Sequence, residues 1–211
     1  MRLMIVTALL SLLIWSPASA GNGSFDYFLL SLSWSPQFCA EHGSQPFARR
    51  QCAAGDRGFV LHGLWPEDND GGHPASCRPA GRVPSRLVDR MLPMMPSEGL
   101  IQHEWVTHGT CSGQSMDDYF DSLAQAFRKL RIPAPLRQPA PPLTTSVRRL
   151  KEMFANANPG LAGSMMTVRC GRGNAVEEVW ICLDKSLNFR DCGGDQFDRC
   201  SGGRARFRSA R

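Results

Sequence analysis

The sequence predicts a single domain of the α+β class, with helices packed on a central, mainly antiparallel sheet and disulfides stapling the fold. Three observations lead to this prediction: strand patterns lie toward both ends of the chain, helical patterns lie mostly in its middle, and there are eight cysteines. The 211 residues, 42% of them hydrophobic, suffice for one large core. This composition excludes collagen-like, coiled-coil and wholly disordered chains.

Two strands are expected in the first third of the chain. Phe25–Trp34 is dense enough in aromatic and aliphatic residues to be buried on both faces, and a Ser-Pro pair ends it. Gly58–His62 predicts a second, short strand. The segment between them is rich in Gly, Gln and Arg, which favours a loop.

Four helices are expected in the middle of the chain. Apolar residues recur at helical spacing in residues 87–92, which stop at a proline, and in residues 100–108, which end at a glycine. The clearest apolar stripe spans residues 116–130, and a further helix is expected over 145–157. Five prolines in residues 132–143 predict a surface connection. A domain linker is the alternative, but the pieces on either side are too short for two cores.

The C-terminal part is expected to hold strands and then a tail. Residues 165–170 and 176–183 favour strands, the second with imperfect alternation, and residues 187–190 suit a hairpin partner. Residues 201–211 contain four arginines and no acidic residue, and they predict a flexible appendage. Such a tail either attracts a polyanion or is merely solvated.

The first twenty residues resemble a secretory signal peptide. Arg2 precedes an apolar run from Leu3 to Trp15, and Ala18-Ser19-Ala20 forms a small-residue cleavage pattern. A membrane anchor is the alternative, but the run is shorter than the roughly 20 residues that span a bilayer. We therefore expect a mature domain over residues 21–200 with no membrane segment, in a secreted or periplasmic location.

The cysteines form an even set in a chain expected to reach an oxidising compartment, which indicates four disulfides. A zinc site is the alternative, but it would need close pairs such as C-x2-C, and the tightest spacing is Cys192 to Cys200. Spacing alone does not choose among the many possible connectivities.

Two short segments gather the residues best suited to catalysis, residues 59–66 (FVLHGLWP) and 103–111 (HEWVTHGTC). On a helix, Glu104 and His108 are i, i+4 neighbours, and His103 and Thr107 form the adjoining pair. Together with His62 of the first segment, they supply what a two-imidazole site needs: one neutral histidine to take a proton and one charged histidine to give one. Such a site can transfer phosphoryl groups without a metal.

A zinc hydrolase is not expected from the second segment. The motif H-E-x-x-H places two zinc ligands one helical turn apart, but here the spacing is one residue longer. On a regular helix His103 and His108 would then diverge by about 140°. The prediction is that no metal is bound there.

The two histidine segments resemble the paired active-site signatures of the ribonuclease T2 family. Residues 28–39 are similar to that family's first strand, residues 176–192 resemble its C-terminal strands, and the likeness covers nearly all of residues 25–200. The resemblance implies a secreted, disulfide-rich, monomeric endoribonuclease that acts on single-stranded RNA and needs no cofactor.

The resemblance also implies a mechanism. His108 would remove the proton of an RNA 2′-hydroxyl, and His62 would protonate the departing 5′-oxygen. His103 and Glu104 would stabilise the negatively charged phosphorane. The product would be a 2′,3′-cyclic phosphate, which slower hydrolysis opens to a 3′-phosphate, and DNA would not be cleaved.

The sequence departs from the family at Thr107, where a lysine is usual. Losing one stabilising group from a transition state costs on the order of 10²–10³-fold in rate. The hydroxyl of Thr107 can still donate a hydrogen bond, or an arginine from elsewhere can supply the charge. The alternative hypothesis is a catalytically weakened RNA-binding or interaction protein on the same scaffold.

Trp65 is the residue best suited to a substrate contact, by stacking on a nucleobase, and packing in the core is the alternative. The resemblance implies further substrate contacts and the disulfide partners. Glu67 and the stretch from Pro96 to Leu100, which includes Ser97, would line base pockets. The implied disulfides are Cys39–Cys52, Cys77–Cys111, Cys170–Cys200 and Cys182–Cys192.

Overall fold

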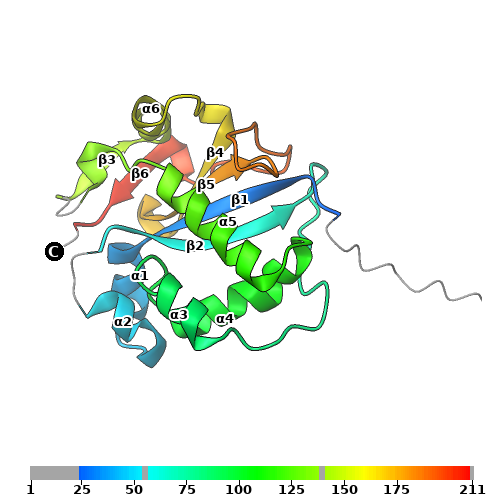
Figure 1. The fold of residues 1–211 in the computed structure, drawn as a ribbon. Coiled ribbons are helices and arrows are strands. Elements are labelled where there is room, and N and C mark those ends of the chain that lie inside the picture. The colour runs from blue at the N-terminus through cyan, green and yellow to red at the C-terminus, as the bar shows by residue number, and fades with distance from the viewer. Residues whose placement is uncertain (1–23, 54–56, 138–140, 210–211) are drawn as a thin grey trace, which may run out of the picture.

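A four-stranded antiparallel sheet forms the centre of the protein, with strand order β2-β1-β5-β4 (Figure 1). The structure is a computed structural model, and it describes residues 24–53, 57–137 and 141–209. The predicted signal peptide lies outside the described residues. The strands of the sheet are β1 (Tyr27–Trp34), β2 (Phe59–Glu67), β4 (Met166–Cys170) and β5 (Val176–Leu183).

The predicted α+β class is confirmed, and so are the four predicted helices. They are α3 (Ser85–Met91), α4 (Glu98–Thr107), α5 (Met116–Lys129) and α6 (Val147–Ala157). Helix α5 lies across β1 and β2 in Figure 1. Its N-terminus is capped by the Ser115 side chain, which accepts from the Asp118 backbone amide. The hydroxyl of Tyr119 donates to the Leu64 carbonyl and ties α5 to β2.

The two faces of the sheet have different environments. One face packs with the helices into the main hydrophobic core, to which Leu30, Leu61 and Ile181 contribute. The other face carries only a small buried cluster around Tyr27 and Leu29. Polar and aromatic side chains lie beside that cluster. The main hydrophobic core does not cover this second face, which is therefore the face on which we expect a functional site.

Two β-bulges interrupt the alternation of the sheet. Along β1, Ser31 pairs with Gly63 but Leu32 pairs with Leu61, so His62 is an extra residue in β2. Along β4, a similar shift leaves Glu177 as an extra residue in β5. This second bulge explains the imperfect alternation of β5, because one added residue moves the following side chains to the other face.

The loop expected between the first two strands is wrong, because short helices fill it. They are α1 (Ser35–His42) and α2 (Arg49–Cys52), with a 3-10 turn at Pro46–Ala48 before α2. The Ser-Pro pair that suggested the end of a strand also begins α1, since proline suits the first turn of a helix. The second strand continues through Glu67, five residues beyond its expected end.

The flexible C-terminal tail is also a wrong prediction, so the domain continues beyond residue 200. Strand β6 (Arg204–Phe207) pairs with β3 (Leu143–Ser146) in a two-stranded antiparallel sheet. Ala205 and Phe207 point inward and are buried, while the intervening arginines are exposed. Four residues are too few for this alternation to stand out from the basic composition. Residues 210 and 211 lie outside the described residues.

Other predicted connections are confirmed in full or only in part. All four implied disulfides are present: Cys39–Cys52, Cys77–Cys111, Cys170–Cys200 and Cys182–Cys192. The expected hairpin at residues 187–190 amounts to one isolated bridge between Leu183 and Phe189. In the described part of the chain, no helix has the length and apolar character needed to cross a membrane.

Candidate active site

The bulge in β2 places His62 on the open face of the sheet. In a regular strand, side chains three residues apart point to opposite faces. The extra residue changes this, so His62 and Trp65 lie on the same face with ring centroids 5.4 Å apart. Bulges are common beside active sites because they redirect a side chain in this way.

Helix α4 supplies the second group of candidate residues. Ser97 caps its N-terminus by accepting from the Leu100 amide at 3.2 Å. The side chain of Glu104 is buried inside the site, and the Oγ1 of Thr107 lies 3.3 Å from Nδ1 of His103. The expected i, i+4 contact between His103 and Thr107 is therefore confirmed.

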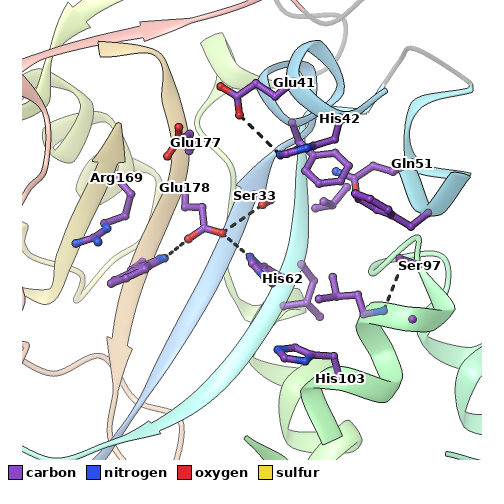
Figure 2. A pocket seen from close by; sticks show the side chains of 17 residues that line it. Ser33, Glu41, His42, Gln51, His62, Ser97, His103, Arg169, Glu177 and Glu178 are labelled. Carbon is purple, nitrogen blue, oxygen red and sulfur yellow. Dashed lines mark hydrogen bonds and ion pairs between the residues drawn. The ribbon is translucent and has the colours of Figure 1, made fainter. Parts of the chain in front are cut away.

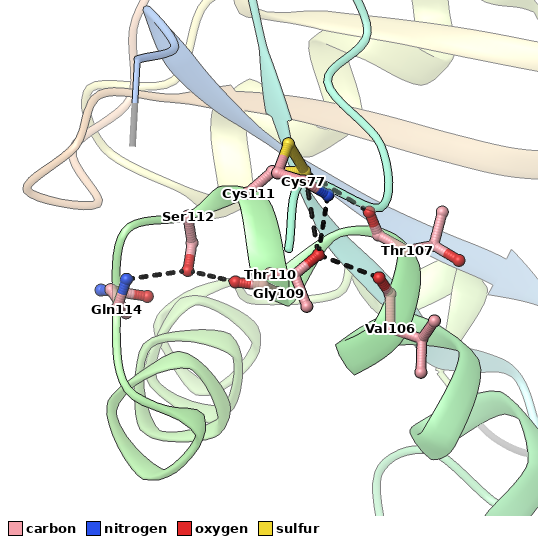
Figure 3. The surroundings of a disulfide bond; sticks show 8 residues. All are labelled: Cys77, Val106, Thr107, Gly109, Thr110, Cys111, Ser112 and Gln114. Carbon is pink, nitrogen blue, oxygen red and sulfur yellow. Dashed lines mark hydrogen bonds between the residues drawn. A yellow bond between two sulfur atoms is a disulfide. The ribbon is translucent and has the colours of Figure 1, made fainter. Parts of the chain in front are cut away.

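His108 follows α4 as its C-terminal cap, and a disulfide holds the turn after it. The turn is a 3-10 helix at Gly109–Cys111. Figure 3 shows the Cys77–Cys111 bond with the Thr110 hydroxyl beside it, which accepts from the Cys77 amide at 3.2 Å and donates to the Val106 carbonyl at 2.9 Å. Cross-linking and hydrogen bonds thus hold the backbone that carries His108.

Trp65 joins these groups into one cluster. Its Nε1 donates to Oε2 of Glu104 at 2.9 Å, and its ring stacks on His108 with centroids 5.1 Å apart. Oε1 of Glu104 in turn lies 4.0 Å from Nε2 of His62. The structure therefore brings His62, Glu104 and His108 around a single indole. A role for Trp65 in stacking on a nucleobase stays a prediction.

Gly63 makes this arrangement possible. A Cβ atom at residue 63 would collide with Oε2 of Glu104 and with Nε1 of Trp65. Any side chain would thus enter the hydrogen bond that ties β2 to α4. The close approach of strand and helix requires glycine at this position.

His103 and His108 lie closer together than the predicted divergence of a regular helix allows, so that prediction was wrong. His103, Glu104 and His108 each offer a ligand atom, and these atoms lie within 4.8 Å of one another, close enough to hold a metal ion. The expected divergence assumed that both histidines belong to a regular helix. His108 instead lies at the cap, with φ −110° and ψ −45°, and its ring turns back toward His103.

The two histidines beside Trp65 have opposite shifts in pKa. The pKa of His108 is lowered to about 3, mainly by burial and in addition by the nearby charges of His103 and His62. Burial also acts to lower the pKa of His62, but the hydrogen bond and charge of Glu178 and the charge of Glu104 outweigh it and raise this pKa. Near neutral pH, His108 is therefore a proton acceptor, and the upward shift in the pKa of His62 favours its charged, proton-donating form.

The pKa of Glu104 is raised to about 8, mainly because the carboxyl is buried. The charge of His62 and the hydrogen bond from Trp65 oppose this shift without cancelling it. Near neutral pH the carboxyl is thus largely protonated and able to donate a hydrogen bond.

Glu178 belongs to the site but was missed in the sequence. Figure 2 shows its carboxylate between Ser33 and His62, and its Oε1 contacts Nδ1 of His62. Its Oε2 accepts from Nε1 of Trp180 at 2.6 Å. Two adjacent glutamates in an otherwise apolar strand were the available signal, but nothing local related them to residue 62.

A groove of about 720 Å³ opens beside His62 and His103 (Figure 2). Ser97 and Leu100, which were expected to line a base pocket, are among its lining residues. Arg169 also lines the groove and places a positive charge in it. The sequence allowed for such an arginine without identifying it.

Glu67 lies apart from this groove, at the end of β2. Its side chain is buried, and its Oε2 contacts Nδ1 of His73, whose Nε2 lies 3.6 Å from Asp195. Burial raises the pKa of Glu67 to about 7, although contact with His73 acts in the opposite direction. The expected base-pocket residues therefore fall in two places, one on each side of Trp65 along the sheet.

Comparison with known proteins gives consistent matches over most of the chain. The model of the Ribonuclease T2 family matches residues 25–192. A ribonuclease of Aeromonas hydrophila is 36% identical over 176 residues, which cover 80% of this chain and 76% of that protein. A probable ribonuclease of Haemophilus influenzae is 32% identical over 181 residues, which cover 79% of this chain and 61% of that protein.

Solved structures show the same fold. A mutant of RNase MC1, the ribonuclease of bitter gourd seeds, in complex with 5′-UMP matches with a TM-score of 0.68. The match covers 86% of this chain and 97% of that chain at 22% sequence identity. At this identity, the likeness concerns the fold alone.

Proposed function

This chain belongs to the ribonuclease T2 family and is an endoribonuclease, and we propose that it cleaves single-stranded RNA by acid–base transesterification between two histidines. The observation that carries the proposal is the contact of His62 and His108 with the same indole, that of Trp65. Their opposite shifts in pKa supply an acceptor and a donor at one pH. No Lewis acid is needed for such proton transfers.

The reaction begins with the neutral ring of His108, which removes the proton of the 2′-hydroxyl. The 2′-oxygen then attacks phosphorus, the bond to the 5′-oxygen breaks, and the charged ring of His62 protonates this leaving group. A 2′,3′-cyclic phosphate forms. In the slower second stage the roles reverse, and water opens the ring to leave a 3′-phosphate. DNA lacks the attacking hydroxyl.

His103 and Glu104 stabilise the phosphorane in this proposal. A protonated Glu104 donates a hydrogen bond to a phosphoryl oxygen, whereas an ionised one would repel it. Its Oε1 is buried and has no hydrogen-bond partner among the described residues, so the proposed contact requires the bound substrate to displace the groups that cover this atom. Thr107 provides no positive charge, but Arg169 lines the adjoining groove.

The substrate would lie along the open face of the sheet. Trp65 stacks on one base, Glu67 contacts that base, and Ser97 and Leu100 line the groove for its neighbour. We also propose that residues 1–20 direct export, that the mature protein acts as a secreted or periplasmic monomer, and that it uses no cofactor. The four disulfides suit an oxidising compartment.

The test is to incubate the oxidised protein with single-stranded RNA in EDTA between pH 4 and 8 and to identify the product ends by mass spectrometry. Cyclic phosphate ends, absent with His62→Ala, His108→Ala or an RNA with a single 2′-deoxy residue at the cleaved position, support the mechanism. Unchanged rates in the two alanine variants would contradict it. Tight RNA binding without cleavage would instead favour the catalytically weakened scaffold.

A further inference from the structure

Glu178 reaches the candidate active site from a distant part of the sequence. It lies on β5, whereas His62 lies on β2, and β1 separates the two strands in the sheet. The bulge in β2 places His62 on the open face, and Glu178 lies on the same face in register with Ser33 of β1, so Oε1 of Glu178 contacts Nδ1 of His62 (Figure 2). Only 16% of the Glu178 side chain is exposed.

The carboxylate of Glu178 is held in one orientation. Its Oε2 accepts the hydrogen bond from Trp180, and its Oε1 accepts from the hydroxyl of Ser33 at 3.4 Å as well as facing His62. The guanidinium of Arg169 lies 4.2 Å from the centre of the Trp180 ring, which holds the indole in turn. The indole, the hydroxyl and the imidazole each donate a hydrogen bond to the Glu178 carboxyl. The ionised carboxylate, which only accepts hydrogen bonds, is therefore the form that satisfies all of them.

This contact fixes which nitrogen of His62 meets the substrate. When Nδ1 donates to a carboxylate, the ring is held in one rotation and one tautomer. Nε2 is then the atom left to exchange a proton, and it is the nitrogen that lies 4.0 Å from Glu104 in the cluster. A negative charge beside the ring also favours the imidazolium that a general acid requires.

We propose that Glu178 is a positioning residue, which accepts the Nδ1 hydrogen bond of His62 and holds this ring protonated with Nε2 directed toward the leaving 5′-oxygen. The proposal rests on the proposed function, because it assigns His62 the part of general acid. Glu178 itself touches no reacting atom. Its effect is exerted through His62, when this ring protonates the leaving group and when it acts with reversed role in the second stage.

Other charged groups surround the pair and belong in any account of its titration. From α4 comes Glu104, and His108 follows it on the far side of Trp65. From β4 comes Arg169, whose charge acts on Glu178, and Glu177 stands beside Glu178 on β5. None of these groups hydrogen-bonds to Nδ1 of His62 among the described residues, so removing Glu178 removes the direct partner.

The experiment compares Glu178→Gln and Glu178→Asp with the wild-type chain, and with Glu152→Gln as a control for loss of an exposed carboxylate on α6. The pKa of His62 is first measured by NMR titration of its ring protons in the full chain without RNA. We expect this pKa to fall by about one unit or more in Glu178→Gln. Glu178→Asp should restore part of the shift, and the control should leave it unchanged.

Kinetics then separate positioning from folding. With RNA, Glu178→Gln should lower kcat by about 10–100-fold with little change in KM, and the alkaline limb of its pH profile should move to lower pH. With a ribonucleoside 3′-phosphodiester of p-nitrophenol, whose leaving group needs no proton, most of this loss should disappear. A merely structural role would lower both rates equally.

The two proposals fail in different ways. Consider a wild-type protein that cleaves RNA and a Glu178→Gln variant that changes neither the pKa of His62 nor the ratio of the rates on RNA and on the p-nitrophenyl substrate. The proposed role of Glu178 would then be wrong, and the proposed function would stand. If wild-type protein does not cleave RNA, the NMR titration still decides whether Glu178 controls His62. Thermal unfolding of each variant verifies that the fold is retained.

Discussion

Trp65 donates a 2.9 Å hydrogen bond to Glu104, and this bond joins strand β2 to helix α4 inside the candidate active site. The donor and the acceptor come from the two histidine segments, so the bond sets the distance between the histidines of one segment and that of the other. It also provides the hydrogen-bond partner of Oε2 in the Glu104 carboxyl, which has no exposed surface.

Replacing Trp65 by phenylalanine removes this donor while keeping an aromatic ring. Oε2 of Glu104 would be left buried without its partner, which costs about 1–3 kcal/mol of the free energy of unfolding. We also expect kcat to fall, because His62 and His108 lose their common contact. Urea unfolding and RNA cleavage assays measure the two effects, with Phe197→Leu as an exposed aromatic control outside the groove. Wild-type stability in Trp65→Phe would contradict the importance of the bond.

The acid limb of kcat/KM should lie well below pH 6.5. The pKa of His108 is lowered to about 3, so this base remains neutral in moderately acidic solution. The raised pKa of His62 moves the alkaline limb in the opposite direction and widens the active range. A pH–rate profile of the wild-type enzyme on RNA provides the test, and an acid limb at or above pH 6.5 would show that His108 is not the base.

Stability should depend on pH through Glu104. Its pKa rises from an ordinary 4.5 to about 8 on folding, so the folded chain binds the extra proton between these values. The resulting stabilisation is full below pH 4.5 and is lost as pH rises through 8. Glu104→Gln cannot lose a proton, so its unfolding free energy should decline less over this window. Parallel curves for the two proteins, from denaturant titrations at each pH, would contradict the assignment.

A lysine at position 107 should increase the rate. Thr107 is half-buried at the last residue of α4, beside His103, and a cation there would act on the developing negative charge. We expect Thr107→Lys to raise kcat by up to about 10²-fold, and Thr107→Met, which has similar length without charge, to leave it low. Equal rates in the two variants would mean that the missing cation does not limit this enzyme.

Two disulfides should affect different kinetic constants. Replacing Cys77 and Cys111 by serine loosens the turn that carries His108, so kcat should fall and stability should drop by about 2–4 kcal/mol. Replacing Cys39 and Cys52 loosens α1 and α2, which border the groove, so KM should rise more than kcat falls. Steady-state kinetics on both double variants test this prediction. An identical loss of kcat in the two variants would contradict it.

Local patterns in the sequence were sufficient for much of the fold. Helices α5 and α6 carry apolar stripes long enough to be recognised, and the buried central strand β1 is dense in large apolar residues. The histidine segments could be found because each concentrates rare residue types in a few positions. These features depend on neighbours along the chain, which is what a sequence pattern contains.

The remaining features depend on partners far away in the sequence. The contact between His62 and Glu178 requires the bulge in β2 and the strand order of the sheet, and neither is encoded in a period of two. The position of His108 depends on where α4 ends. Because the helix ends at Thr107, His108 no longer follows helical geometry, and its ring lies close enough to His103 for the two to share a metal ion. Strand β6 was missed, and its partner β3 was divided between the expected connection, which ended at Leu143, and the expected helix, which began at Thr145.

Strand β6 also determines when the protein can finish folding during its synthesis. Its Phe207 packs edge-on against Trp34 of β1 with ring centroids 5.1 Å apart, and the carbonyl of Arg208 accepts from the Trp34 indole. The core around Trp34 therefore stays open until β6 has left the ribosome, long after both histidine segments. Residues 204–208 are thus needed to close the core around Trp34, although they lie far in the sequence from both histidine segments.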